Sequence, residues 1–159
     1  MVQLAVTVAP LEIGEVDLAY PLVALGDHPP SLDSWRILAK KAVQGQAEGR
    51  LCGVMVARRR SQIRGLFTYE VSTTVSPSIL CIGHLSVSEP LESLVPWDHL
   101  LWSIVELGQQ NNCAAVHIGL PPDRSWLLDR WPDPEALANP IAVACTVRRI
   151  RSVPTLQTL

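Results

Sequence analysis

The chain has 159 residues, of which 48% are hydrophobic and 18% are charged, and its formal net charge is -2. These values fit one domain with a full apolar core and exclude an intrinsically disordered chain. The nearly balanced charge argues against a dedicated nucleic-acid binder, and no apolar run reaches the roughly 18 residues of a membrane span.

The first half of the chain predicts a strand, two helices and three strands joined by short connections. Pro21 lies inside the first helical pattern and makes that helix short or bent. Ser31 is placed to cap the second helix, which we expect Gly45 and Gly49 to end. A short polar turn between two strand patterns predicts a β-hairpin. The expected elements are a strand at 2–10, helices at 15–26 and 31–43, and strands at 50–58, 63–72 and 78–87.

The second half predicts a helix, a buried strand, a short helix and a last strand. Trp97, Leu100, Leu101, Ile104 and Val105 follow helical spacing in the first of these elements. A strand, a helix and a further strand in this order indicate a right-handed crossover between parallel strands. The expected elements are a helix from 97 to 108, a strand at 113–121, a helix at 123–131 and a strand at 142–150.

These patterns predict an α/β (α+β) fold with a mixed, mainly antiparallel sheet. We expect six or seven strands flanked by about four helices, in the order β-α-α-β-β-β-α-β-α-β.

The cysteines and the arginine clusters suggest no special site. The four cysteines form no CxxC pair and have no His-x-His neighbour, which argues against zinc and, without a signal peptide, favours a reducing cytoplasm. Arginines surround the hairpin turn and follow the last strand, and we expect them to be solvated. The residues are Cys52, Cys81, Cys113 and Cys145, and Arg58, Arg59, Arg60, Arg64, Arg148, Arg149 and Arg151.

The phrase "LCGVMVARRRSQIRGLFTYEV", followed by "LCIGHLSV" and then by "LLWSIVELGQQNNCAAVHIGLP", resembles the GNAT superfamily of acyl-CoA-dependent N-acetyltransferases. The resemblance covers residues 2 to about 150. In that family the fourth strand ends in a valine, a loop R/Q-x-x-G-x-G/A follows, and two leucines open the next helix. Here these positions correspond to Val87, Leu100 and Leu101. The resemblance implies a single GNAT-like domain over residues 1–159, with a loose tail from about residue 152.

The loop that would hold the CoA pyrophosphate departs from the family pattern. Glu92 stands at the basic or amide position, Pro96 lacks an N–H group, and Asp98 adds negative charge. Ser93, Val95 and Trp97 occupy the glycine positions. Trp97 has two readings, as a core residue that fills the cofactor slot or as a ring that stacks on the ligand. The resemblance implies acetyl-CoA contacts at Leu85, Ser86, Val87, Ser93, Leu94, Val95 and Trp97.

His84 is the predicted catalytic base. Its ordinary pKa of about 6.5 suits proton transfer near neutrality, and the resemblance places a base in this strand. Strand alternation predicts that His84 and Ser86 point away from the face shared by Cys81, Leu85 and Val87.

Other candidate groups have weaker support. His117, on the next strand, could share a cleft with His84 if these two strands splay, as they do in the family that the chain resembles. Tyr69 could border this cleft, but both residues have simpler structural readings. The family's usual general acid is a tyrosine in the following short helix, where this chain has Asp129 and no tyrosine.

The resemblance implies an enzyme that transfers an acetyl group from acetyl-CoA to an amine of a small molecule or a protein, without a metal. The alternative is a GNAT-fold binding or interaction module that has lost the use of acetyl-CoA. A homodimer that completes the site at its interface is a third reading. We expect no nucleic-acid or membrane partner and a cytoplasmic location.

Overall fold

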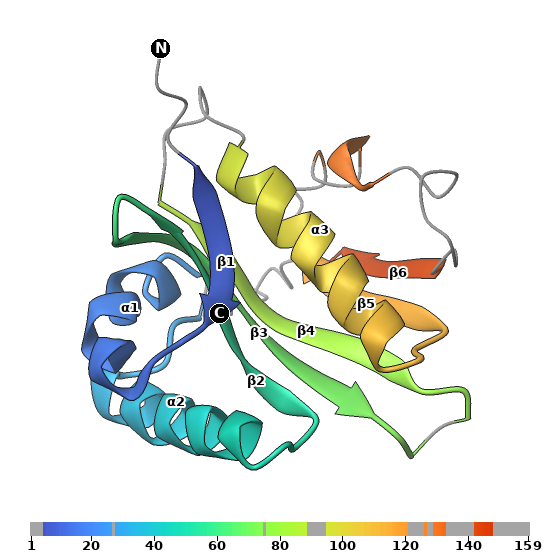
Figure 1. Cartoon of the computed structure of the whole chain (residues 1–159), viewed down its shortest axis with the longest axis horizontal. Coiled ribbons are helices and arrows are strands. Elements are labelled where there is room, and N and C mark those ends of the chain that lie inside the picture. Colours follow the sequence, from blue (N-terminus) through green and yellow to red (C-terminus); the bar gives the residue numbers. More distant parts are fainter. Residues whose placement is uncertain are drawn as a thin grey trace, which may run out of the picture.

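The computed structural model forms one sheet with helices on both faces (Figure 1). In chain order the elements are β1 (Val6–Pro10), a 3-10 turn (Ile13–Glu15), α1 (Val16–Val23), α2 (Leu32–Ala47), β2 (Cys52–Arg59), β3 (Gln62–Ser72), β4 (Ile79–Val87), α3 (Val95–Gln110), β5 (Ala115–Leu120) and β6 (Ala142–Val147). The structure describes residues 5–26, 28–74, 76–88, 95–120, 126 and 129–132, together with the backbone of 142–147.

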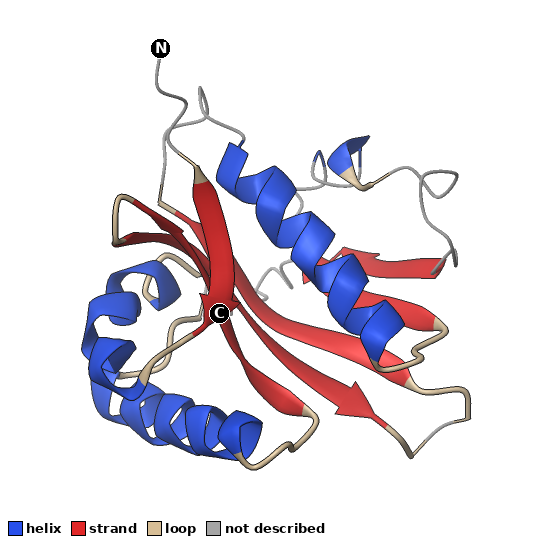
Figure 2. Cartoon of the chain, viewed as in Figure 1, coloured by secondary structure: helices blue, strands red, loops and turns tan. Residues whose placement is uncertain are grey.

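The sheet is mixed, as predicted. Its strands lie in the order β1-β2-β3-β4-β5-β6, with antiparallel pairs from β1 to β4 and parallel pairs from β4 to β6 (Figure 2). Helix α3 is the crossover from β4 to its parallel neighbour β5. The expected helix at 123–131 lies mostly outside the described residues, as does the tail from residue 152, so the expected number of helices stays a prediction.

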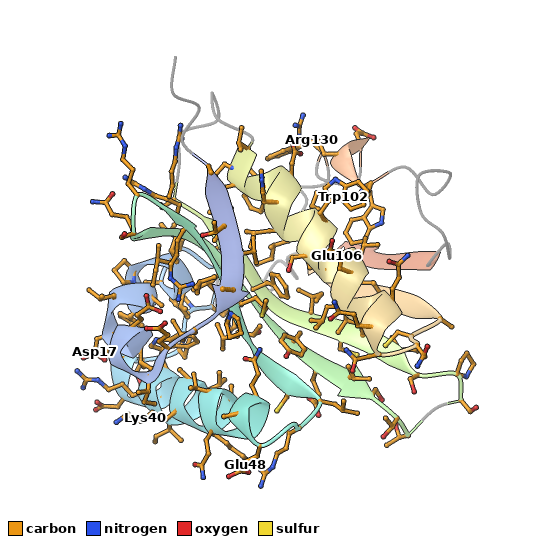
Figure 3. The ribbon with its side chains drawn as sticks, in the orientation of Figure 1. Asp17, Lys40, Glu48, Trp102, Glu106 and Arg130 are labelled. Carbon is orange, nitrogen blue, oxygen red and sulfur yellow. The ribbon has the colours of Figure 1, made fainter. Side chains whose placement is uncertain are left out.

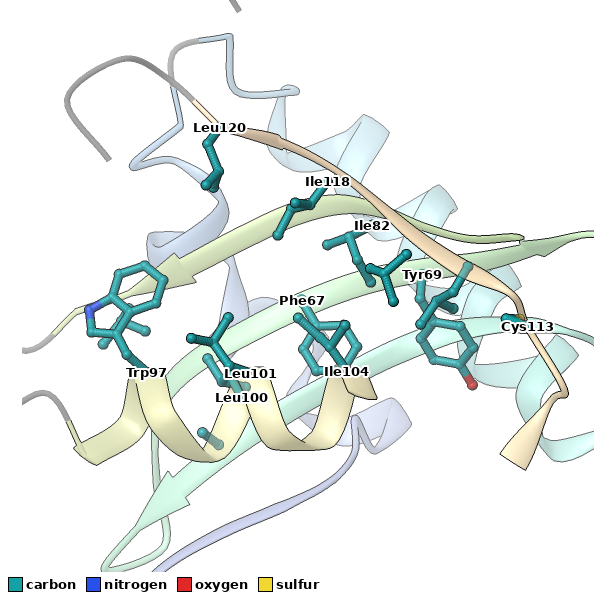
Figure 4. Close-up of a cluster of buried hydrophobic side chains, with 14 of the residues drawn as sticks. Phe67, Tyr69, Ile82, Trp97, Leu100, Leu101, Ile104, Cys113, Ile118 and Leu120 are labelled. Carbon is teal, nitrogen blue, oxygen red and sulfur yellow. The ribbon is translucent and has the colours of Figure 1, made fainter. Parts of the chain in front are cut away.

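Two hydrophobic clusters fill the spaces between the layers. One lies under α1 and α2, where Trp35 is fully buried and its Nε1–H donates to the Val16 carbonyl at 2.7 Å. The other lies under α3, where the predicted helical stripe meets the strands. Figure 4 shows this second cluster extending from Trp97 at one end of α3 to Tyr69 and Cys113 at the other.

Local sequence signals explain most of the element boundaries. The Ser31 side chain accepts a hydrogen bond from the Ser34 N–H at 3.2 Å, which confirms the predicted cap of α2. The hairpin turn between β2 and β3 consists of Arg60 and Ser61, both with positive φ.

One boundary was predicted wrongly, because α2 continues through Gly45 to Ala47. Gly45 is buried there, and an added Cβ would lie 3.3 Å from both Arg50 Cδ and Cys52 Sγ. This glycine therefore serves close packing of the helix on β2, and Gly49, with φ of 77°, follows the helix end.

The expectation that the hairpin arginines are solvated is wrong for Arg58. Its guanidinium makes a two-point ion pair with Glu15, whose carboxylate accepts from Arg58 Nε at 3.1 Å and from Nη2. The Arg58 hydrogen bonds lower the pKa of Glu15. The pair fastens the 3-10 turn to β2. Of the helices that the structure describes, none has the length and apolar character needed to cross a membrane.

Candidate functional site

Strands β4 and β5 separate halfway along the sheet. They pair from Ile79 with Ala115 to Ile82 with Ile118. Beyond this point β4 continues to Val87, whereas the last residues of β5 pair only with β6. The separation leaves a gap in the sheet, as the family resemblance implies.

A β-bulge lies where the gap opens. Thr68 of β3 stands opposite two residues of β4, Gly83 and His84, because the register shifts by one between Phe67 and Tyr69. The Thr68 Oγ1 accepts the His84 N–H at 2.9 Å. A Cβ at Gly83 would lie 2.5 Å from the same oxygen, so this position requires glycine unless Thr68 moves.

The bulge corrects the predicted alternation of β4. Leu85 and Val87 lie on the α3 face together with Ile82, whereas Cys81 lies on the opposite face, where it lines a hollow beside α2. The prediction that Cys81 shares a face with Leu85 and Val87 is therefore wrong, because one extra residue reverses the alternation. His84 is half-buried at the bulge, and its role as the base stays a prediction.

The edge of β4 that faces the gap carries backbone groups of two residues that pair with no other described strand. The Ser88 N–H donates to the carbonyl of Arg64 in β3 at 2.8 Å. Ser86, two residues earlier, is the register partner of Leu66 in the same ladder. In an antiparallel ladder the intervening residues direct their N–H and C=O groups to the other side. Leu85 and Val87 therefore present these groups to the gap, and neither pairs with β5. Both residues were predicted to contact acetyl-CoA.

Trp97 lies in the core at the start of α3. It is 5% exposed and packs edge-on against Trp126, with 5.9 Å between the ring centroids. Val87 and Leu120 belong to the same buried cluster. The structure thus favours the core-filling reading, and a contact of Trp97 with a cofactor stays a prediction.

The other predicted loop residues have different outcomes. Val95 is 40% exposed as the first residue of α3. Ser93 and Leu94 lie outside the described residues. Ser86 is described, and its side chain is buried.

Arg130 is a residue that sequence reasoning missed. Arg130 is labelled in Figure 3, and its Nε and Nη2 donate to the Asp98 carboxylate at 3.0 and 2.7 Å. Asp98 lies in the first turn of α3, where its charge was expected to oppose a phosphate. The Arg130 guanidinium offsets the negative charge of Asp98, so the start of α3 repels an anion less than the sequence indicates.

A hollow of about 410 Å³ lies on the face of the sheet beside α2. Cys52, Glu70 and Cys81 are register neighbours on β2, β3 and β4, and all three line the hollow, as does Gly83 at the bulge. Helix α2 contributes Leu38, Lys41 and Ala42. No sequence motif signals this set, because packing across four elements brings it together.

The remaining candidates are His117 and Tyr69, and Tyr69 is the register partner of Ile82, next to the bulge. His117 pairs with Cys81 in the closed part of the ladder and is exposed. Tyr69 is buried in the core under α3, and this burial, with a smaller effect of Cys52, raises the pKa of its phenol. Among the described residues no group of three His, Cys, Asp or Glu side chains could hold a metal.

Solved structures with the same arrangement include several acetyltransferases. The chain aligns with aminoglycoside N-acetyltransferase AAC(6')-Iy in complex with CoA at a TM-score of 0.64 and 12% identity, over 94% of this chain and 97% of that one. Glucosamine-6-phosphate N-acetyltransferase from Arabidopsis thaliana aligns at a TM-score of 0.62 and 9% identity, over 79% and 89%. The chain has the GNAT fold. A transcriptional regulator from Bacillus halodurans C-125 shares this architecture, with a TM-score of 0.65 and 12% identity over 79% and 88%.

The sequence itself gives no closer assignment. No family model and no curated protein sequence matches the chain. The GNAT likeness is therefore one of fold, and it confirms the fold that the sequence resemblance implied.

Proposed function

We propose that the protein transfers an acetyl group from acetyl-CoA to an amine. The observation that supports this most directly is the backbone edge of Leu85 and Val87 in the gap between β4 and β5, which pairs with no other strand of the described residues. An amide-containing chain such as pantetheine can pair with such an edge as an additional strand would. The CoA complex of AAC(6')-Iy, a protein of the same fold, is consistent with this proposal.

In this proposal the two substrates reach the bulge from different sides. The bulge at Gly83 and His84 connects the gap with the hollow beside α2, since Gly83 lines that hollow. The thioester would reach the bulge through the gap, and the amine would approach from the hollow. His84 would take the proton that the amine nitrogen loses as its bond to the acetyl carbon forms. The C–S bond breaks in the same exchange, and the departing thiolate takes a proton from water.

The phosphates contribute less to binding in this proposal than the strand edge does. Pro96 removes one donor from the first turn of α3, and Arg130 is already engaged by Asp98. We therefore expect acetyl-CoA and S-acetyl-pantetheine, which lacks the nucleotide and its phosphates, to bind within about tenfold of each other. Isothermal titration of both compounds measures this ratio.

A proline at Val87 tests the strand edge itself. Val87→Pro removes an N–H group that faces the gap and spares the ladder with β3. Val87→Ala is the matched control, because it shortens the same buried side chain and keeps the N–H group.

We expect Val87→Pro to weaken acetyl-CoA binding at least tenfold relative to Val87→Ala, which corresponds to about 1.4 kcal/mol. Equal affinities of the two folded variants would contradict the strand-edge role. If neither acetyl-CoA nor acetyl-pantetheine binds the wild-type protein at millimolar concentration, the transferase proposal is wrong.

A further inference from the structure

The hollow beside α2 contains one cationic and one anionic side chain that have no partner among the described residues. Lys41 extends from α2, and Glu70 extends from β3. Neither takes part in an ion pair or a side-chain hydrogen bond within the part of the chain that the structure describes. A ligand with two opposite charges would satisfy both groups at once.

Most other charged side chains of α2 are ion-paired, and the exception among its described residues is Lys40, which does not line the hollow. Arg36 of α2 binds Asp17 and Asp33 at 2.8 and 3.2 Å. At the end of the same helix, Arg50 lies 3.3 Å from Glu48. Lys41 and Glu70 thus line the hollow without an ion pair to another described residue. A concave site concentrates the field of its charges and raises the local concentration of a complementary ligand.

Apart from Thr68 and Tyr69, the rest of the lining is apolar or small, so the hollow suits a short carbon chain. Leu38 and Ala42 form the helix wall, and Cys52, Cys81 and Gly83 lie on the sheet. A volume of about 410 Å³ falls in the range of small-molecule sites, and such sites combine apolar walls with a few placed polar groups.

The positions of Glu70 and Lys41 determine which end of the ligand lies on the sheet that carries the bulge. Glu70 is the register neighbour of Cys81, which lies two residues before Gly83, whereas Lys41 lies on the helix wall. A positive group attracted by Glu70 therefore lies on the sheet side of the hollow, which also carries the bulge. A negative group at Lys41 lies on the helix side.

We propose that the acceptor is an amine that also carries a carboxylate, namely an amino acid or an ω-amino acid, bound with its ammonium at Glu70 and its carboxylate at Lys41. The transfer step rests on the proposed function, whereas binding of the amino acid does not. In the transfer step the bound ammonium gives one proton to solvent water to become the neutral nucleophile, and the nitrogen gives a second proton to His84 as the amide forms and the C–S bond breaks.

Titrations without acetyl-CoA test the binding site alone. The probes are the ω-amino acids from glycine to 6-aminohexanoate, with hexylamine and hexanoate as singly charged controls. We expect one chain length to bind best, at least tenfold tighter than either control. Equal binding of hexylamine and of every amino acid, or no binding of any amino acid, would overturn the proposal.

Matched charge changes locate the site. Lys41→Glu is compared with Lys40→Glu, its neighbour on α2, which Figure 3 shows on the outside of the helix. Glu70→Gln is compared with Glu106→Gln on α3, which packs on the other face of the sheet. We expect a loss of at least tenfold in amino-acid affinity for the first member of each pair and less than twofold for the second. Equal effects within a pair would overturn the assignment.

Transfer assays distinguish this proposal from the proposed function. Acetylation of simple alkylamines as efficient as that of amino acids would overturn the acceptor assignment and leave the transferase proposal intact. Carboxylate-dependent binding without any acetyl transfer would support the acceptor site and contradict the transferase proposal.

Discussion

Thr68→Val tests whether one side-chain hydrogen bond holds the bulge of β4. Valine matches threonine in shape but lacks the Oγ1 that accepts the His84 N–H at 2.9 Å. A donor left without a partner in a half-buried position costs about 1–2 kcal/mol. In a domain of this size each kcal/mol corresponds to roughly 2–4 °C in melting temperature, so we expect a decrease of about 2–8 °C.

The assay combines thermal unfolding with hydrogen exchange of the His84 amide. In Thr68→Val this amide should exchange faster, and acetyl-CoA affinity should fall because the adjoining edge at Leu85 shifts. Thr68→Ser keeps the oxygen and should preserve both properties. Gly83→Ala should resemble Thr68→Val, since its Cβ would displace the same oxygen. Unchanged exchange and unchanged affinity in Thr68→Val would refute the reasoning.

Three further predictions concern stability and reactivity. The Arg58 hydrogen bonds lower the pKa of Glu15 below its ordinary value of 4.5. The pair therefore contributes stability above pH 4.5, and this contribution is lost as the pH falls below that value. Glu15→Gln should flatten this part of a curve of unfolding free energy against pH. Trp35→Phe should lower the free energy of unfolding by about 1–3 kcal/mol in urea titrations, because a buried carbonyl loses its donor. Burial, with a smaller effect of a neighbouring thiol, raises the pKa of Cys113, so iodoacetamide should label it more slowly than Cys52, as peptide mass spectrometry can check.

The sequence predicted the order of the elements because periodicity and capping are local properties. The Ser31 cap, the hairpin turn and the stripe of α3 all depend on neighbours within a few residues. The gap between β4 and β5 followed from the family resemblance, and the structure contains it.

The faces of β4 and the hollow beside α2 were not predicted because they depend on strand register. A hairpin with a two-residue turn would place Cys52 opposite Tyr69, but an irregularity at Ala57 and Arg58 places it opposite Glu70 instead. A second irregularity, at Thr68, reverses the faces of β4. Bulges have weak sequence signals, so the hollow that depends on both of them could not be predicted.

The short ladder between β4 and β5 also has a consequence for local unfolding. Only four register pairs join the described parts of these strands, whereas the ladder between β2 and β3 has eight. Strands β5 and β6 are therefore joined to the rest of the sheet by the weaker ladder. Helix α3 contacts strands on both sides of this ladder. Local unfolding should begin along this ladder, and a ligand bound between β4 and β5 would stabilise it against opening.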